Sequence, residues 1–250
     1  MTVKTNYVVA ATTSAPYSTT ATSPTLPVTG NVGDVLICSA ASWEFSSASP
    51  GSRTLAMATA GWTQLNLEEF QVYPTFPAYA NRRTHLATWW KIATSTSDTV
   101  TVTLSGASEA LLGLWVGVNR IVGIPNPTVV DQGPATKRDN VDLGVNPAST
   151  WTHAPSAATP SQVSLLVRCS LFNGGSQPPT GYAFPAHSSG GGFVPYLQMA
   201  GGGTVSTYVY WRMGAPSLIT FANTNSSDIV SSLTLDFDYP VLTHTGAMLS

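Results

Sequence analysis

The chain has 250 residues, of which only 9% are charged, and its formal net charge at pH 7 is −2. Soluble domains carry about 25% charged residues on average, so this composition argues against the basic clusters with which proteins bind nucleic acids. The aromatic content of 10% argues against a disordered chain, because many rings in a weakly charged chain favour collapse into a core.

The sequence predicts neither a secretory signal at its N-terminal segment nor a membrane-spanning helix. Its apolar run, Val8–Ala11, has four residues, whereas the apolar core of a signal peptide needs about 7–15. The longest apolar stretch, Ala110–Val118, is about half of the roughly 20 residues that a membrane-spanning helix needs. Two interpretations stay open for the segment up to about Pro27: an ordered strand, or an arm that orders on assembly.

Short segments with the two-residue alternation of β-strands recur along the chain. In Thr99–Leu104, the valines and the leucine face one way and the threonines the other. Ala110–Val118 is apolar on both faces, which is typical of a central strand, and Leu233–Tyr239 alternates again. Helical periodicity is nearly absent, and 21 Gly and 18 Pro residues punctuate the rest. The predicted fold class is therefore all-β.

The aromatic residues of two predicted strands are assigned to faces by the same alternation. We expect Trp90 and Trp211 to face the core, and Trp89, Tyr208 and Tyr210 to point to the opposite side.

Three short blocks recur at nearly one offset, which indicates an internal duplication. The offsets are 120 residues for the first block (182 − 62 = 120) and 121 for the other two (211 − 90 = 121; 233 − 112 = 121). The matched pairs are Gly61–Thr63 with Gly181–Ala183, Trp90–Ala93 with Trp211–Gly214, and Leu112–Trp115 with Leu233–Asp236.

The opening strand of each half follows this offset less well. Aligning Asp34–Ile37 with Gln162–Leu165 needs an offset of 128, and aligning Cys38 with Cys169 needs 131. The two cysteines are therefore not treated as equivalent. Buried thiols are their simplest interpretation, and a single disulfide stays open.

The duplication predicts one domain over residues 1–250. We expect a jelly-roll-like antiparallel β-sandwich of two similar halves of about five strands each, at about 25–130 and 150–242. Facing sheets would bury the apolar side of both halves. The alternative is two tandem small sandwiches joined at about 131–147, a segment with the composition of a linker.

No motif of an enzyme or a cofactor site is found, so we expect no catalytic, cofactor-binding or metal-ligating residues. A nucleophile elbow, a P-loop, a zinc-protease helix motif and an EF-hand loop are all missing from the sequence. The four histidines are scattered without metal-ligand spacing. Gly190–Gly192 and Gly201–Gly203 are interpreted as surface loops.

One pair of carboxylates resembles the acids of a glycosidase. Asp236 and Asp238 are two residues apart and share a strand face, but solvated acids on an outer face are the preferred interpretation. A glycan-cleaving enzyme would require one of them to face Glu44 or Glu109 across a groove.

An aromatic loop is the candidate contact site for a partner. It contains two prolines and is bracketed by Glu68–Glu69 and Arg82–Arg83. Flat rings with polar edges suit stacking on sugars. The candidate residues are Phe70, Tyr73, Phe76 and Tyr79.

The order of motifs in the first half resembles a known class of proteins. The motifs are Gly33–Leu36, Gly61–Leu65, Thr88–Thr94, Thr99–Leu104 and the strand ending at Val118. This order is similar to that of β-sandwich structural proteins of tailed bacteriophages, often described as minor tail, tail-fibre or head-decoration proteins. The similarity covers about residues 25–130 well and 150–240 more loosely, and none of its motifs carries a catalytic residue.

The resemblance implies a non-enzymatic virion structural protein, a capsid-decoration or tail-associated surface component assembled in the host cytoplasm. Its partners would be other capsid or tail proteins and copies of itself. The scarcity of charge agrees with extensive packing against neighbours. The alternative function is a carbohydrate-binding or receptor-binding module for host adsorption, with a host-surface glycan as partner.

Overall fold

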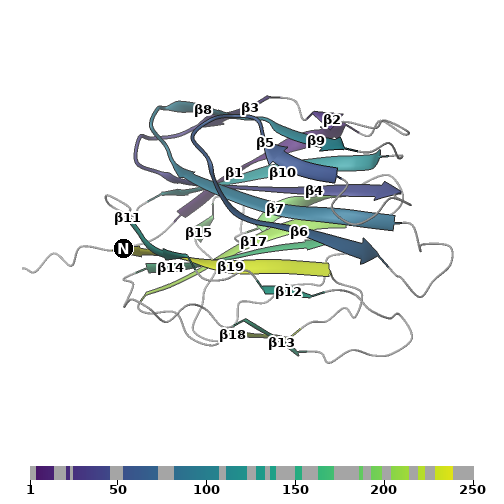
Figure 1. The fold of residues 1–250 in the computed structure, drawn as a ribbon. Helices are drawn as coiled ribbons and strands as arrows, with labels where there is room; N and C mark the ends of the chain where they lie inside the picture. The colour runs from purple at the N-terminus through teal and green to yellow at the C-terminus, as the bar shows by residue number, and fades with distance from the viewer. Residues whose placement is uncertain are drawn as a thin grey trace, which may run out of the picture.

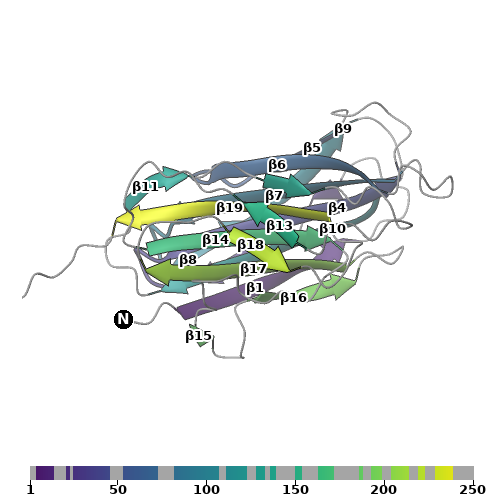
Figure 2. The same cartoon turned by 90° about the horizontal axis from the view of Figure 1, so that it is seen from below.

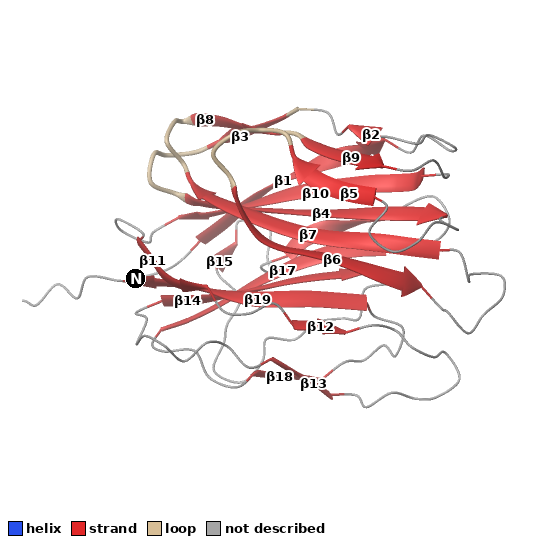
Figure 3. Cartoon of the chain, viewed as in Figure 1, coloured by secondary structure: helices blue, strands red, loops and turns tan. Residues whose placement is uncertain are grey.

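Extended strands make up the regular structure of this protein in the computed structural model (Figure 3). Among the residues described, every regular element is a β-strand, so the predicted all-β class is confirmed. None of these residues belongs to a helix long and apolar enough to cross a membrane. The structure describes residues 4–13, 21–22, 25–45, 53–72, 82–106, 111–122, 128–132, 136–138, 150–153, 163–171, 186–187, 193–198, 204–213, 219–222 and 229–238.

The first large sheet has the strand order β15-β1-β10-β4-β7-β6 (Figure 1). All its pairs are antiparallel except the two-residue parallel pairing of β1 with β15. As expected for an apolar strand, β10 lies in the interior of the sheet, between β1 and β4. The strands are β1 (Lys4–Thr13), β4 (Val35–Phe45), β6 (Thr63–Val72), β7 (Arg82–Ile92), β10 (Leu111–Val122) and β15 (Ala186–His187).

Two small sheets cover one face of the first large sheet, above it in Figure 1. One has the order β2-β9-β5 and the other pairs β3 with β8. Between these layers lies an apolar core to which both contribute, for example Leu36 and Trp89 from below and Leu55 and Val100 from above. The covering strands are β2 (Ala21–Thr22), β3 (Leu26–Thr29), β5 (Arg53–Met57), β8 (Ser97–Val100) and β9 (Val102–Gly106).

The alternation predicted for Thr99–Leu104 is confirmed, but the segment forms two strands rather than one. Val100, Val102 and Leu104 are fully buried, whereas Thr99 is exposed. The break falls at Thr101, where the chain stops pairing with β3 and starts pairing with β5 and β2.

The assignment of Trp90 to the core and Trp89 to the opposite side is wrong for the core of the first half. Trp89 is 2% exposed and belongs to the core cluster, whereas Trp90 is only partly buried on the other face. The alternation is misleading here because β7 has a tryptophan on each face and both rings are at least partly buried, so side-chain type does not show which of them faces the core.

The second large sheet has the order β11-β19-β14-β17-β16, and β12 also pairs with β19. It lies below the first in Figure 1, with β14 close to β7 and β19 close to β6. The pair β13–β18 lies on its far side (Figures 1 and 2). These strands are β11 (Thr128–Gln132), β12 (Thr136–Arg138), β13 (Thr150–His153), β14 (Val163–Leu171), β16 (Phe193–Gln198), β17 (Thr204–Met213), β18 (Ile219–Ala222) and β19 (Ile229–Asp238).

The two large sheets connect their strands in corresponding order. From one edge to the other, β1-β10-β4-β7-β6 in the first sheet corresponds to β11-β19-β14-β17-β16 in the second. Each sheet also has a two-stranded companion, β3–β8 or β13–β18, whose strands precede and follow the equivalent strands in the chain.

Strand register tests two of the repeat offsets. Ile37 pairs with Trp90 in the first sheet, and Leu165 pairs with Trp211 in the second. The offset of 128 from Ile37 to Leu165 and the offset of 121 from Trp90 to Trp211 therefore both join equivalent positions. In the neighbouring strands, however, Ile37 pairs with Asn119 and Leu165 with Leu235. These pairings make Asn119 equivalent to Leu235, whereas the repeat offset of 121 would match Asn119 with residue 240. The block Leu112–Trp115 is therefore matched out of register with Leu233–Asp236.

Three expectations about the halves need correction in the described residues. The chain forms ten strands up to Val122 and nine from Thr128, not about five in each half. The first sheet includes Lys4–Thr13, which precedes the expected start of the first half at residue 25. Of the two interpretations left open for the N-terminal segment, this part forms an ordered strand. Parts of the expected linker, up to Gln132 and at Thr136–Arg138, pair with β19.

Several other predictions lie outside the described residues. They concern the block Gly181–Ala183 and the loops Gly190–Gly192 and Gly201–Gly203. In the second large sheet, β16 has the position that β6 has in the first, and it begins at Phe193.

The two cysteines lie in different sheets, Cys38 in β4 and Cys169 in β14.

Candidate functional site

Three turns gather at one end of the first large sheet, where the described loops are drawn tan in Figure 3. They join β3 to β4, β5 to β6, and β7 to β8. Backbone hydrogen bonds tie the first and third turns together: Gly30 N–H donates to the Thr96 carbonyl (3.1 Å), and Gly33 N–H to the Ala93 carbonyl (2.8 Å). Ala93 N–H donates in return to the Asp34 carbonyl (2.8 Å). This end of the sheet is therefore closed by a continuous set of main-chain contacts.

Asp34 organises the turn that leads into β4. The preceding residue, Gly33, has a φ of 93°, which L side chains rarely adopt. The Asp34 carboxylate accepts hydrogen bonds from the backbone N–H of Asn31 (2.8 Å) and from Arg120 Nε (2.5 Å). A Cβ on Gly30 would collide with the Arg120 side chain, so this glycine leaves room for the guanidinium. The Gly-Asp motif of the sequence thus positions an internal ion pair.

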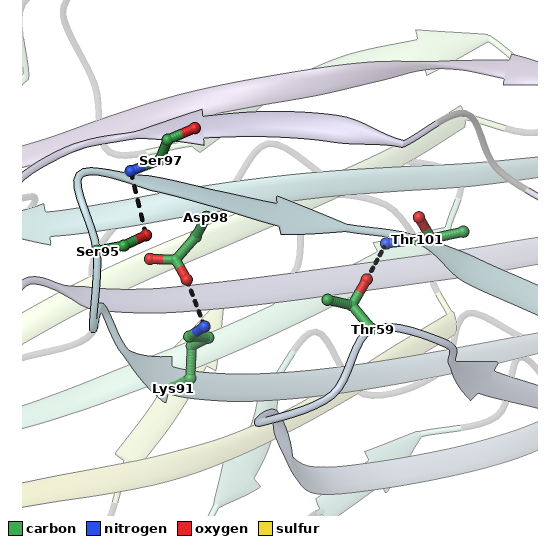
Figure 4. A network of polar contacts seen from close by, with 6 residues as sticks. All are labelled: Thr59, Lys91, Ser95, Ser97, Asp98 and Thr101. Atoms are coloured by element: carbon green, nitrogen blue, oxygen red, sulfur yellow. Dashed lines mark hydrogen bonds and ion pairs between the residues drawn. The ribbon is translucent and has the colours of Figure 1, made fainter.

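A second ion pair links β7 to β8. The Lys91 ammonium contacts the Asp98 carboxylate (Figure 4), and the side chains are 11% and 7% exposed. Lys91 Nζ also lies 5.8 Å from the centroid of the Trp62 ring, within cation–π range. Trp62 follows Gly61, whose φ is 84°. The Gly-Trp motif therefore places an aromatic ring against this ion pair.

The two cations flank one residue of the core. Leu36 pairs in register with Arg120 of β10 on one side and with Lys91 of β7 on the other. Each cation is neutralised by a carboxylate, and Leu36 itself is 1% exposed. The apolar core thus ends at the four charged side chains of Asp34, Lys91, Asp98 and Arg120.

Hydroxyl groups complete this end of the molecule (Figure 4). Thr101 N–H donates to Thr59 Oγ1 (2.9 Å), and Ala58 N–H donates to the Thr101 carbonyl (2.8 Å). Ser97 N–H donates to Ser95 Oγ (3.2 Å). These bonds satisfy backbone groups at the ends of β8 and at the start of the turn to β6.

A serine–histidine contact that the sequence reasoning missed lies further along the sheet. Ser42 Oγ is 3.2 Å from His85 Nδ1 and accepts the His85 backbone N–H (3.1 Å). Such a contact can activate a nucleophile. Here Ser42 is 0% and His85 3% exposed, so a substrate cannot reach the hydroxyl. The pair is structural, and only the register of β4 with β7 brings the two residues together.

Of the predicted partner residues, only Phe70 falls within a described strand. Its backbone lies in β6 opposite Thr84. The side chain of Phe70, together with Tyr73, Phe76 and Tyr79, lies outside the described residues.

The carboxylates considered for glycan cleavage belong to different strands. Asp236 lies in β19 opposite Asp131 and Ser164, whereas Glu44 lies in β4 of the other large sheet. Glu109 is outside the described residues. In the part of the chain whose side chains are described, no three His, Cys, Asp or Glu residues form a group that could hold a metal ion.

Comparison of the chain with protein-family models, with curated proteins and with solved structures gave no match.

Proposed function

We propose that the chain is a non-enzymatic structural protein of a tailed-bacteriophage particle, a capsid-decoration or tail-associated surface component. One observation carries this proposal. The charged side chains that the structure describes, Asp34, Lys91, Asp98 and Arg120, all close the core through internal ion pairs. Charges that are paired inside the protein leave the neighbouring described surface neutral, which suits packing against other subunits.

The motifs behind the resemblance to phage proteins support the same role. Gly33 and Gly61 allow turns with positive φ, Asp34 orients Arg120, and Trp62 packs on Lys91. Each motif residue thus has a structural task, as expected for a family that shares a scaffold rather than a reaction.

The proposed architecture over residues 1–250 is a duplicated β-fold of two similar halves, for which the sequence left open one jelly-roll-like sandwich or two tandem sandwiches. The corresponding strand order of the two large sheets supports the duplication. The layer order favours two sandwiches, each with its own covering strands, packed through their large sheets, because β4 is buried on both faces. Their join would then fall between β10 and β11 rather than at 131–147.

The proposed partners are other capsid or tail proteins and copies of the chain, assembled in the host cytoplasm. Immunogold electron microscopy tests this directly. Phage particles purified from a culture that expresses the chain are labelled with an antibody against it, and particles lacking the gene serve as control. Label over the heads or along the tails is the expected result. Particles without label would overturn the proposal.

A carbohydrate-binding or receptor-binding module is the second candidate, and label confined to tail tips would favour it. It depends on the aromatic loop between β6 and β7. Binding of the purified chain to a glycan array, lost in Tyr73→Ala and Phe76→Ala but kept in Thr63→Ala, would establish it.

A further inference from the structure

We propose that one face of the second large sheet binds a carbohydrate. The inference goes beyond the proposed structural role, does not depend on it, and concerns a site other than the aromatic loop. It comes from a comparison of the two halves, whose large sheets have corresponding strand orders. The face, here called the polar face, is defined by two rows of residues paired across β19, β14 and β17. These rows are Thr234, Leu166 and Tyr210, and Ser232, Arg168 and Tyr208.

The polar face corresponds to the face that carries the apolar core in the first half. Ile37 and Leu165 are equivalent positions, because each lies opposite one of the matched tryptophans. Three residues further along both strands, Ala40 is therefore equivalent to Arg168. Ala40 belongs to the core between the first sheet and its covering strands. By the same correspondence, the polar face lies on the side of the companion pair β13–β18, away from the first sheet (Figures 1 and 2).

The alternation within the second sheet agrees with this placement. On the face opposite to that of Arg168, the paired strands place mainly apolar residues, for example Leu165 between Trp211 and Leu235. An apolar face suits packing against the first large sheet, whose strands β7 and β6 lie close to β14 and β19.

Residues of different chemistry occupy the equivalent rows of the two halves. In the first half, Val116, Ala40 and Ala87 form one row of the core and are at most 1% exposed. Among the strands that the structure describes, the register places no acidic residue beside Arg168 in the equivalent row. An unpaired guanidinium is strongly disfavoured in an apolar core. The polar face therefore borders water or a polar ligand.

The residue types of the polar face fit the chemistry of a sugar. Tyr208 and Tyr210 are two residues apart on β17 and so share the face. Flat rings with polar edges suit stacking on sugar rings. Sugar hydroxyl groups both donate and accept hydrogen bonds, so they can bond to the guanidinium of Arg168 and to the hydroxyl residues in the two rows. On the same side of the sheet, β13–β18 places Trp151 directly opposite Phe221.

The distribution of charge favours a sugar over other polar ligands. In the next row, Ser164 lies between Arg212 and Asp236, so the face carries both signs of charge. A polyanion such as a nucleic acid would be repelled by Asp236, and a polycation by the arginines. A neutral hydroxyl group can accept from a guanidinium and donate to a carboxylate. A protein interface would have an apolar centre, whereas Arg168 lies in the middle of this face.

The test is binding of the full purified chain to an array of neutral and acidic bacterial-surface oligosaccharides, followed by calorimetry with the strongest ligand. Arg168→Gln removes the guanidinium, and Tyr208→Thr removes a ring but keeps a residue that suits strands. Each should raise the dissociation constant at least about tenfold. Lys137→Gln is the matched control, because it removes a cation from the same sheet but lies opposite Ser231, on the other face. Circular dichroism confirms that each variant is folded.

A measurement on the wild-type chain covers the case in which a variant fails to fold. The bound oligosaccharide should slow amide hydrogen exchange in peptides of β14 and β17, but not in peptides of β4 and β7. Slower exchange confined to β4 and β7 would contradict the inference.

Three results of the array and calorimetry experiments would overturn the inference. They are no binding to any oligosaccharide, an equal effect of Lys137→Gln and Arg168→Gln, and binding that Tyr73→Ala and Phe76→Ala abolish while Arg168→Gln leaves it unchanged. The last would place the site in the aromatic loop. Sugar binding through the polar face without immunogold label on particles would leave this site standing and contradict the structural role. Label without sugar binding would do the reverse.

Discussion

At the scale of single residues, two glycines allow the turns that close the first sheet. Gly33 and Gly61 have φ values of 93° and 84°. A Cβ built on Gly61 would meet no atom within 4 Å, so space is available there and only the backbone conformation requires glycine. For a residue with a Cβ, this conformation costs about 1–2 kcal/mol.

We therefore expect Gly61→Ala to lower the free energy of unfolding by about 1–2 kcal/mol. Gly61→Asn should cost less, because asparagine enters the left-handed region more readily than alanine. Urea unfolding monitored by tryptophan fluorescence measures both. An equal loss for the two variants would mean that the backbone conformation is not the cause.

The ion pair of Lys91 with Asp98 gives a second prediction at this scale. Lys91→Met leaves a mostly buried carboxylate without its cation, and breaking such a pair costs about 3–5 kcal/mol. The double variant Lys91→Met/Asp98→Leu removes both charges and should recover most of that loss. A double variant as unstable as the single one, in the same urea titration, would contradict this account.

At the scale of elements, Thr101 separates two strands that a continuous alternation predicts as one. Its backbone groups bond to Thr59 Oγ1 and to the Ala58 N–H instead of to a neighbouring strand. The alternation of Val100, Val102 and Leu104 is predicted correctly because one face of both strands covers the same core. The break cannot be predicted from this pattern, since it depends on which strands lie alongside.

Thr59→Val tests the role of this contact. Valine has nearly the same shape as threonine but accepts no hydrogen bond, so the part-buried Thr101 N–H loses its acceptor. We expect a loss of about 1–3 kcal/mol in the free energy of unfolding. Thr63→Val, at an exposed position of β6, is the control and should change stability by less than about 0.5 kcal/mol.

At the scale of the whole molecule, strand β4, in the interior of the first large sheet, is buried on both faces over residues 35–42. One face of β4 packs under the covering sheets through Leu36 and Cys38, and the other, with Val35 and Ile37, is turned to the second large sheet. A strand that is buried on both faces does not alternate between apolar and polar side chains, so the sequence pattern cannot assign its faces. The same limit explains why the alternation assigns Trp89, on the adjacent strand β7, to the wrong side.

The face turned to the second sheet contains Asn119, which is 1% exposed. Neither polar atom of its carboxamide has a hydrogen-bond partner in the described structure. Asn119→Leu replaces this group by an apolar one of similar size, so we expect the free energy of unfolding to rise by about 1–3 kcal/mol. Asn119→Asp should lower it, because a buried charge is less well tolerated still. Destabilisation by leucine would show that the amide is bonded between the sheets.

The sequence by itself determined the β-class, the burial of Val100, Val102 and Leu104 on one face, and the matched positions of Trp90 and Trp211, because these follow from local side-chain periodicity and from short repeated sequence blocks. Tertiary structure decided the remainder. The ion pair of Asp34 with Arg120 joins residues 86 positions apart, and the contact of Ser42 with His85 joins residues 43 apart. Such contacts depend on which strands become neighbours and in which register. The alternation of side chains within one strand does not show which strand it pairs with.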